Sequence, residues 1–121
     1  MKIIITENKF KNLINKYVGY DLTHRIEMIT SWENLTGSEK HNVFGDRKDV
    51  FNHYLNNYGP MYLFSNIQGH NYLVQKQEKQ IWFIVNTSTG YEIDYYDFLS
   101  MLNIDMLGIS LSEIINKLVE E

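Results

Sequence analysis

Ile81-Trp82-Phe83-Ile84-Val85 is a run of five apolar residues, so an extended chain here is apolar on both of its faces. A strand of this kind is typical of a sheet position that is covered on both sides. We therefore expect residues 81–85 to form the central strand of a sheet, with other elements packed above and below it.

The residues around this run show the period of two that is typical of strands. A polar connection at 76–80 and a turn at 87–90 separate the apolar stretches from one another. The segment is therefore predicted to form an antiparallel meander. Its expected strands are residues 61–64, 72–75, 81–86 and 91–93.

Four other segments show the i, i+3, i+4, i+7 spacing of amphipathic helices. Thr6, Asp46 and Asp94 are the expected N-caps of the first three helices. Ser110 and Glu113 form a capping box at the start of the fourth. The four apolar stripes are Phe10-Leu13-Ile14-Tyr17, Phe51-Tyr54-Leu55-Tyr58, Tyr95-Phe98-Leu99-Leu102 and Leu111-Ile114-Ile115-Leu118.

Two further segments have a less definite pattern. Residues 20–29 alternate between apolar and polar side chains, which favours a strand but leaves a helix open. Residues 31–45 have no clear period and are expected to form a long loop, anchored to the body by Trp32 and Phe44.

Together these elements predict one α+β domain over residues 1–121. We expect an antiparallel sheet of three to five strands, with about four helices packed mainly on one face. The last two helices are expected to form a C-terminal helical hairpin.

The composition excludes several classes of chemistry. The chain has no cysteine, which rules out disulfides, thiolate metal sites and thiol nucleophiles. Its seven glycines occur singly, and the sequence contains no P-loop, G-x-G-x-x-G, G-x-S-x-G or H-E-x-x-H motif. We therefore assign no catalytic residue, no metal site and no cofactor from the sequence.

The charge and hydropathy of the chain limit the classes of ligand and the compartment that we expect. The net charge is −4, and residues 91–121 carry seven acidic side chains against Lys117 alone. Nucleic acid is not expected as the main ligand, because the phosphate backbone requires a basic surface. No apolar run approaches the ~18–20 residues of a membrane span, so we expect a soluble, cytoplasmic protein.

The residue usage indicates an origin. The chain has no alanine, fourteen isoleucines, thirteen asparagines and nine lysines to two arginines, a bias typical of AT-rich coding. Its start, residues 1–14, resembles that of small uncharacterised proteins of large tailed bacteriophages. The resemblance implies a phage or mobile-element protein in the host cytoplasm, either a virion component or an accessory protein acting on a host factor.

Histidines offer one enzymatic alternative. Asp49 and His53 have i, i+4 spacing on the second predicted helix, and His70 lies in a polar turn between strands. A small hydrolase using His53 and His70 with nearby carboxylates therefore remains a hypothesis.

An acidic and aromatic cluster offers the leading interpretation. Tyr91, Asp94, Tyr96 and Asp97 surround the start of the third predicted helix, and tyrosine is common at the centre of protein interfaces. With Trp32 in the 31–45 loop, they are the predicted partner-binding residues. We expect a non-enzymatic protein-binding accessory protein; the alternatives are a virion or assembly component, in which case a homo-oligomer is possible, and the small hydrolase.

Overall fold

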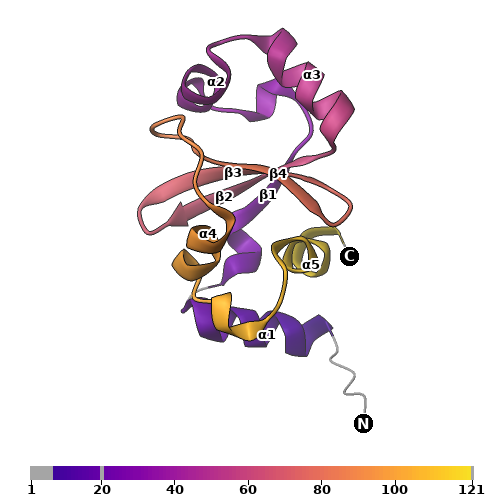
Figure 1. Ribbon diagram of the computed structural model, residues 1–121, viewed down its shortest axis with the longest axis vertical. Helices are drawn as coiled ribbons and strands as arrows, with labels where there is room; N and C mark the ends of the chain where they lie inside the picture. Colours follow the sequence, from indigo (N-terminus) through magenta and orange to yellow (C-terminus); the bar gives the residue numbers. More distant parts are fainter. Residues whose placement is uncertain (1–6, 20, 121) are drawn as a thin grey trace.

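The structure is a computed structural model that describes residues 7–19 and 21–120. A four-stranded antiparallel sheet lies between two layers of helices (Figure 1). The expected α+β class and the expected number of strands are confirmed.

The sheet has the simplest antiparallel order, β1-β2-β3-β4. The two-residue turn between β2 and β3 has a positive φ at both Gln68 (50°) and Gly69 (84°), which is the type I′ geometry that suits the twist of a hairpin. The strands are β1 (Ile26–Ile29), β2 (Met61–Ile67), β3 (His70–Gln77) and β4 (Gln80–Asn86).

The prediction that residues 81–85 form the central strand is wrong. β4 is an edge strand, and β2 and β3 occupy the centre, where Tyr62, Phe64 and Leu73 are fully buried. The run is apolar on both faces because β4 is still covered on both sides. Phe83 packs against the buried cluster on one face of the sheet, and Ile84 belongs to the buried cluster on the other face.

Helices cover both faces of the sheet, whereas the sequence suggested mainly one. The alternation along β2 explains the difference, since Tyr62 and Phe64 pack into one layer while Met61 and Leu63 pack into the other. One layer, above the sheet in Figure 1, holds α2 (Gly37–Phe44) and α3 (Lys48–Tyr58). The opposite layer holds α1 (Glu7–Val18), α4 (Tyr95–Met101), α5 (Leu111–Ile115) and the π-helical turn η4 (Asn116–Glu120).

The two indefinite segments take definite structures. Within residues 20–29, a 3₁₀ turn η1 (Leu22–Arg25) leads into β1, so the strand interpretation holds for the second half; Tyr20 lies outside the described residues.

Residues 31–45 are not a loop, because they contain the 3₁₀ turn η2 (Trp32–Asn34) and helix α2. A capping box begins α2: Thr36 Oγ1 accepts from the N–H of Glu39 (3.2 Å), and Glu39 Oε1 accepts from the N–H of Thr36 (2.9 Å). The helix shows no clear apolar period because Phe44 is its only buried apolar residue. The expected anchoring is confirmed, since the rings of Trp32 and Phe44 lie 5.7 and 5.3 Å from the ring of Phe51 on α3.

The helix ends agree with the predicted caps in part. Asp94 caps α4, and Ser110 caps α5 by accepting from the N–H of Glu113. Asp46 does not cap α3, which begins at Lys48 after Arg47. The predicted cap Thr6 lies outside the described residues. The C-terminal hairpin is not confirmed, because η4 packs against α1 and β1.

Gly90, in the turn after β4, packs closely against the backbone of helix α2. Its φ is +75°, and a Cβ built there lies 2.2 Å from the backbone oxygen of Asn42. We expect Gly90→Ala to lower the free energy of unfolding by about 1–3 kcal/mol, because the backbone must shift from a left-handed conformation. Urea unfolding followed by circular dichroism measures the change. Gly37→Ala is the control, since its site is open and has no positive φ; an equal loss in both variants would contradict the argument.

Candidate functional site

The chain returns along the outer edge of β4 before entering α4. The N–H of Asn86 donates to Tyr91 O (3.0 Å), and the N–H of Ile93 donates to Ile84 O (2.9 Å). Residues 91–93 therefore form a single bridge, Val85 with Glu92, in place of the predicted strand. This bridge fixes the start of the predicted binding residues against the sheet.

We call Tyr91, Asp94, Tyr96 and Asp97 the acidic–tyrosine patch. Tyr91 and Tyr96 are 74% and 71% exposed, the largest values among the aromatic side chains described as exposed. Asp94 Oδ2 accepts from the N–H groups of Tyr96 (2.9 Å) and Asp97 (3.3 Å), so this carboxylate also holds the first turn of α4. The patch thus projects two rings and two carboxylates from an ordered helix start.

Tyr95 lies behind the patch and is half-buried. Its hydroxyl accepts from the N–H of Leu111 (3.0 Å), which joins α4 to the start of α5, and its ring meets Tyr96 edge-on with centroids 5.2 Å apart. These two contacts hold the backbone that carries Tyr96.

Trp32, the fifth predicted binding residue, lies in the α2–α3 layer. Its ring is 6.2 Å from Phe44 and 5.7 Å from Phe51, and Lys40 Nζ lies 5.4 Å from its centroid. Trp32 is half-buried in that cluster, and the structure does not bring it to the acidic–tyrosine patch.

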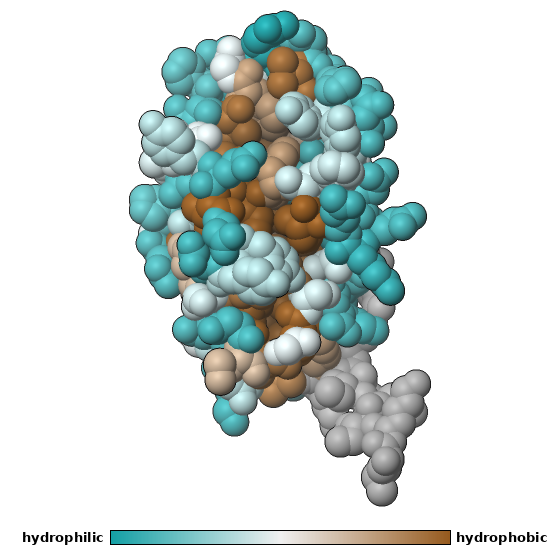
Figure 2. All heavy atoms as spheres, viewed as in Figure 1, coloured by the Kyte–Doolittle hydropathy of each residue, from teal (hydrophilic) through white to brown (hydrophobic). Residues whose placement is uncertain are grey.

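A groove of about 570 Å³ runs along the outer edge of β4 and ends beside the patch. Figure 2 shows hydrophobic side chains gathered along the middle of one face of the molecule, with hydrophilic side chains on both sides. Two smaller hollows, of about 260 and 220 Å³, adjoin the groove and share Phe83 and Glu92 with it. The groove is lined by Lys79, Ile81, Trp82, Phe83, Ile84, Glu92, Ile93, Asp94 and Tyr95.

A β-bulge shapes this groove. Gln75 pairs with Phe83 and Lys76 pairs with Ile81, which leaves Trp82 as an extra residue in β4. The bulge turns Trp82 and Phe83 toward α3 together, where their rings meet Tyr58 (4.8 Å) and Tyr54 (6.1 Å). Trp82 nevertheless remains 42% exposed.

The edge of β4 also presents backbone groups to the groove. The N–H of Lys76 donates to Pro60 O (3.1 Å), on the β2 side of the sheet. Its cross-strand partner Ile81 therefore directs its own N–H and C=O away from β3, toward the groove. Edge groups directed outward in this way can pair with another extended chain.

The groove has a mainly acidic rim. Glu92 and Asp94 lie on it against the single cation Lys79. Within residues 7–19 and 21–120, no basic side chain forms an ion pair with either carboxylate. This charge distribution favours a cationic partner.

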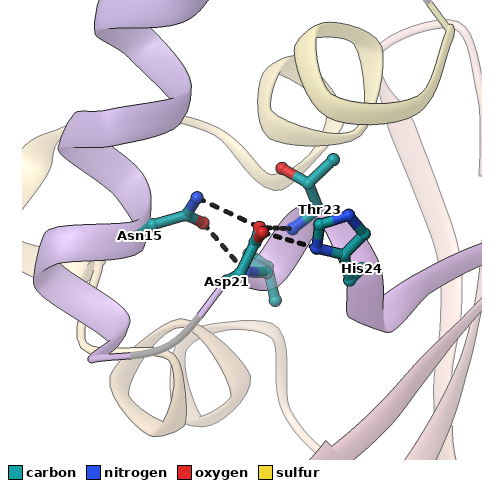
Figure 3. A network of polar contacts seen from close by, with 5 residues as sticks. Asn15, Asp21, Thr23 and His24 are labelled. Atoms are coloured by element: carbon teal, nitrogen blue, oxygen red, sulfur yellow. Dashed lines mark hydrogen bonds and ion pairs between the residues drawn. The ribbon is translucent and has the colours of Figure 1, made fainter.

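A second polar cluster lies where α1 meets η1 (Figure 3). Asp21 Oδ2 lies 2.5 Å from His24 Nδ1, and Asp21 Oδ1 accepts from Asn15 Nδ2 and from the N–H of Thr23, both at 3.1 Å. Burial would raise the pKa of Asp21, but the charge and hydrogen bond of His24 and the bonds from Thr23 outweigh it and lower the pKa. Both side chains are exposed, and the cluster lines none of the hollows described above, so it supports the chain turn.

His53 and His70, the two histidines of the hydrolase hypothesis, lie on different elements. His53 lies on α3, on one face of the sheet, with Asn57 Nδ2 3.3 Å from its Nδ1. His70 begins β3 beside a turn whose Gln68 contacts Met101 O, on the opposite face. Among the described residues, no three His, Asp or Glu side chains are grouped so as to hold a metal ion. In that same part of the chain, every helix is too short or too polar to cross a membrane.

Comparison of the chain with protein-family models, with curated proteins and with solved structures gives no significant match.

The Asp21 cluster makes a prediction in the acid range. A lowered pKa means that the stabilising contribution of Asp21 is present above pH 3.8 and is lost as the pH falls through the folded-state value. A carboxyl-carbon NMR titration should give Asp21 a midpoint below 3.8, and His24→Ala should raise that midpoint. His41→Ala is the control and should leave Asp21 unchanged. A wild-type midpoint at or above 3.8 would contradict the assignment.

Proposed function

We propose that this chain is a non-enzymatic accessory protein that binds another protein through the acidic–tyrosine patch and the adjoining groove. The observation that carries the proposal is the groove of about 570 Å³ along the open edge of β4, which ends beside the patch. A groove with exposed aromatic side chains, outward-directed backbone groups and a charged rim has the parts that recognition of a protein segment requires.

The chemistry of the patch supports a protein ligand. Tyr91 and Tyr96 are exposed, rigid and amphipathic, so each can bury a ring against a partner and still hydrogen-bond through its hydroxyl. Asp94 is held by two backbone N–H groups, so little side-chain freedom is lost when a cationic partner approaches.

We further propose that the protein is encoded by a phage or mobile element and acts on a host or phage protein in the host cytoplasm. The AT-rich residue usage and the resemblance of residues 1–14 support this origin. The principal alternative is a virion or assembly component, which the open strand edge would also serve by joining copies. A hydrolase using His53 and His70 has less support, because His53 lies on α3, which covers one face of the sheet, whereas His70 pairs with Ile67, which packs against the other face.

The test is loss of the partner when the patch rings are removed. We expect the double variant Tyr91→Ser/Tyr96→Ser to retain about one tenth or less of the partner that wild type captures from lysate, because interface tyrosines carry a large share of binding energy. Mass spectrometry with isotope labels measures the ratio. Tyr17→Ser is the matched control, since Tyr17 is 48% exposed on α1 and belongs to neither the patch nor the lining of the groove.

Three results would contradict the proposal. The first is a wild-type protein that recovers no partner and is monomeric by light scattering. The second is an equal loss of partner in the double variant and in Tyr17→Ser. A stable homo-oligomer that incorporates into particles would select the assembly alternative.

A further inference from the structure

An aromatic pocket of about 260 Å³ opens beside the groove, between α3 and the bulge of β4. Its walls are Tyr54, Tyr58, Trp82 and Phe83, and Glu92 stands at its rim. Ring centroids lie 4.8 Å apart for Tyr58 and Trp82, 5.6 Å for Tyr54 and Tyr58, and 6.1 Å for Tyr54 and Phe83.

The rings face the pocket from several directions. The planes of neighbouring rings are inclined by 40°, 59° and 81°, so they enclose a volume instead of stacking as one flat surface. His53 meets Tyr54 and Tyr58 edge-on at 5.8 and 6.0 Å, which supports both rings from the side of α3.

The pocket also has an uncompensated negative charge. Glu92 pairs with Val85 across the bridge and so shares the face of Phe83. No described basic side chain forms an ion pair with Glu92. Lys79 lines the groove but not this pocket, and Lys76 Nζ donates to Glu78 O (3.2 Å).

We propose that this pocket binds an alkylammonium group, supplied by a lysine side chain of a partner segment that lies extended along β4. An ammonium group is attracted by the negative faces of aromatic rings, and a nearby carboxylate adds to that attraction. Inclined rings suit this compact cation, whereas a planar guanidinium is best met by one flat ring face. The lysine source rests on the proposed function; the cation site itself does not.

A single extended segment fits better than a second copy of this chain. Antiparallel pairing of two β4 edges centred on Trp82 would place the Glu78–Lys79 turn of one copy beside Val85 and Asn86 of the other. Residues 91–93 already occupy that position through their bonds to Ile84 and Asn86. A lone segment can leave the edge before it reaches them.

Trp82 supplies a direct probe of the cation site. The chain has two tryptophans, so an ¹⁵N–¹H spectrum contains two indole signals, and Trp82→Phe identifies one of them. We expect choline to shift the Trp82 signal saturably and to leave Trp32 unmoved. The neutral isostere 3,3-dimethylbutanol should bind roughly tenfold more weakly, because it lacks the charge that the rings and Glu92 attract. Equal binding by the isostere, or an unmoved Trp82 signal, overturns the proposal.

Two variants and their controls separate the site from general destabilisation. Glu92→Gln and Tyr58→Leu should each raise the dissociation constant for choline roughly tenfold. Glu27→Gln on the opposite edge strand and Tyr17→Leu on α1 should leave it unchanged. Each variant must have the same unfolding midpoint as wild type. If Tyr58→Leu does not, the effect of Glu92→Gln on choline binding decides the test.

The lysine source is tested with fluorescent decapeptides of alternating valine and lysine, valine and arginine, or valine and glutamate. We expect the lysine peptide to bind tightest and to shift the amide signals of Ile81 and Ile84. Choline binding with no preference for the lysine peptide overturns the lysine source alone. If neither choline nor the lysine peptide binds, but partner capture still depends on Tyr91 and Tyr96, the cation-binding proposal is overturned and the proposed function stands.

Discussion

The two central strands have no solvent-facing side, and the rest of the structure depends on this constraint. Met61 and Leu63 of β2 are buried against α2 and α3, while Tyr62 and Phe64 are buried against α1, α4 and α5. Burying both faces of a sheet requires two helical layers, because each apolar surface must be removed from water. The order of elements along the chain satisfies this requirement, with α2 and α3 before the meander and α4 and α5 after it.

The candidate site follows from the position of β4 at the side of this sandwich. An edge strand is covered above and below but not laterally, so the space beside it becomes a groove. The returning segment fills one end of that groove through Ile93, and the bulge at Trp82 widens the other end. Rings from α3 and the carboxylate of Glu92 then meet beside the groove into which Ile81 directs its backbone groups.

Local features of this fold could be predicted from sequence, and long-range ones could not. The stripe from Phe51 to Tyr58 and the cap at Asp94 are contained within a few residues, so their patterns give the helices directly. The position of β4 at the edge is different, because an apolar run covered on both faces has the same pattern in the centre as at the edge. Helix α2 was missed because it buries one apolar side chain, Phe44, although its capping box was present in the sequence.

The same limit applies to the candidate site. Tyr91, Asp94, Tyr96 and Asp97 were found because they are near neighbours along the chain. Residues 81–85 were predicted to be covered on both sides, and the pattern could not show that Trp82 is exposed, because its exposure depends on the register between β3 and β4. Tyr54 and Tyr58 belong to a predicted helix face, but no local sequence pattern predicts that this face packs against the bulge at Trp82.

The bulge at Trp82 has a consequence for the solubility of the protein at high concentration. A regular, flat strand edge is a template on which identical chains stack into fibrils. The extra residue interrupts the even spacing of backbone groups along β4 and increases its local twist, so copies cannot stack in register along the full strand. The edge of β4 is therefore a poor template for amyloid growth, although part of it faces the groove.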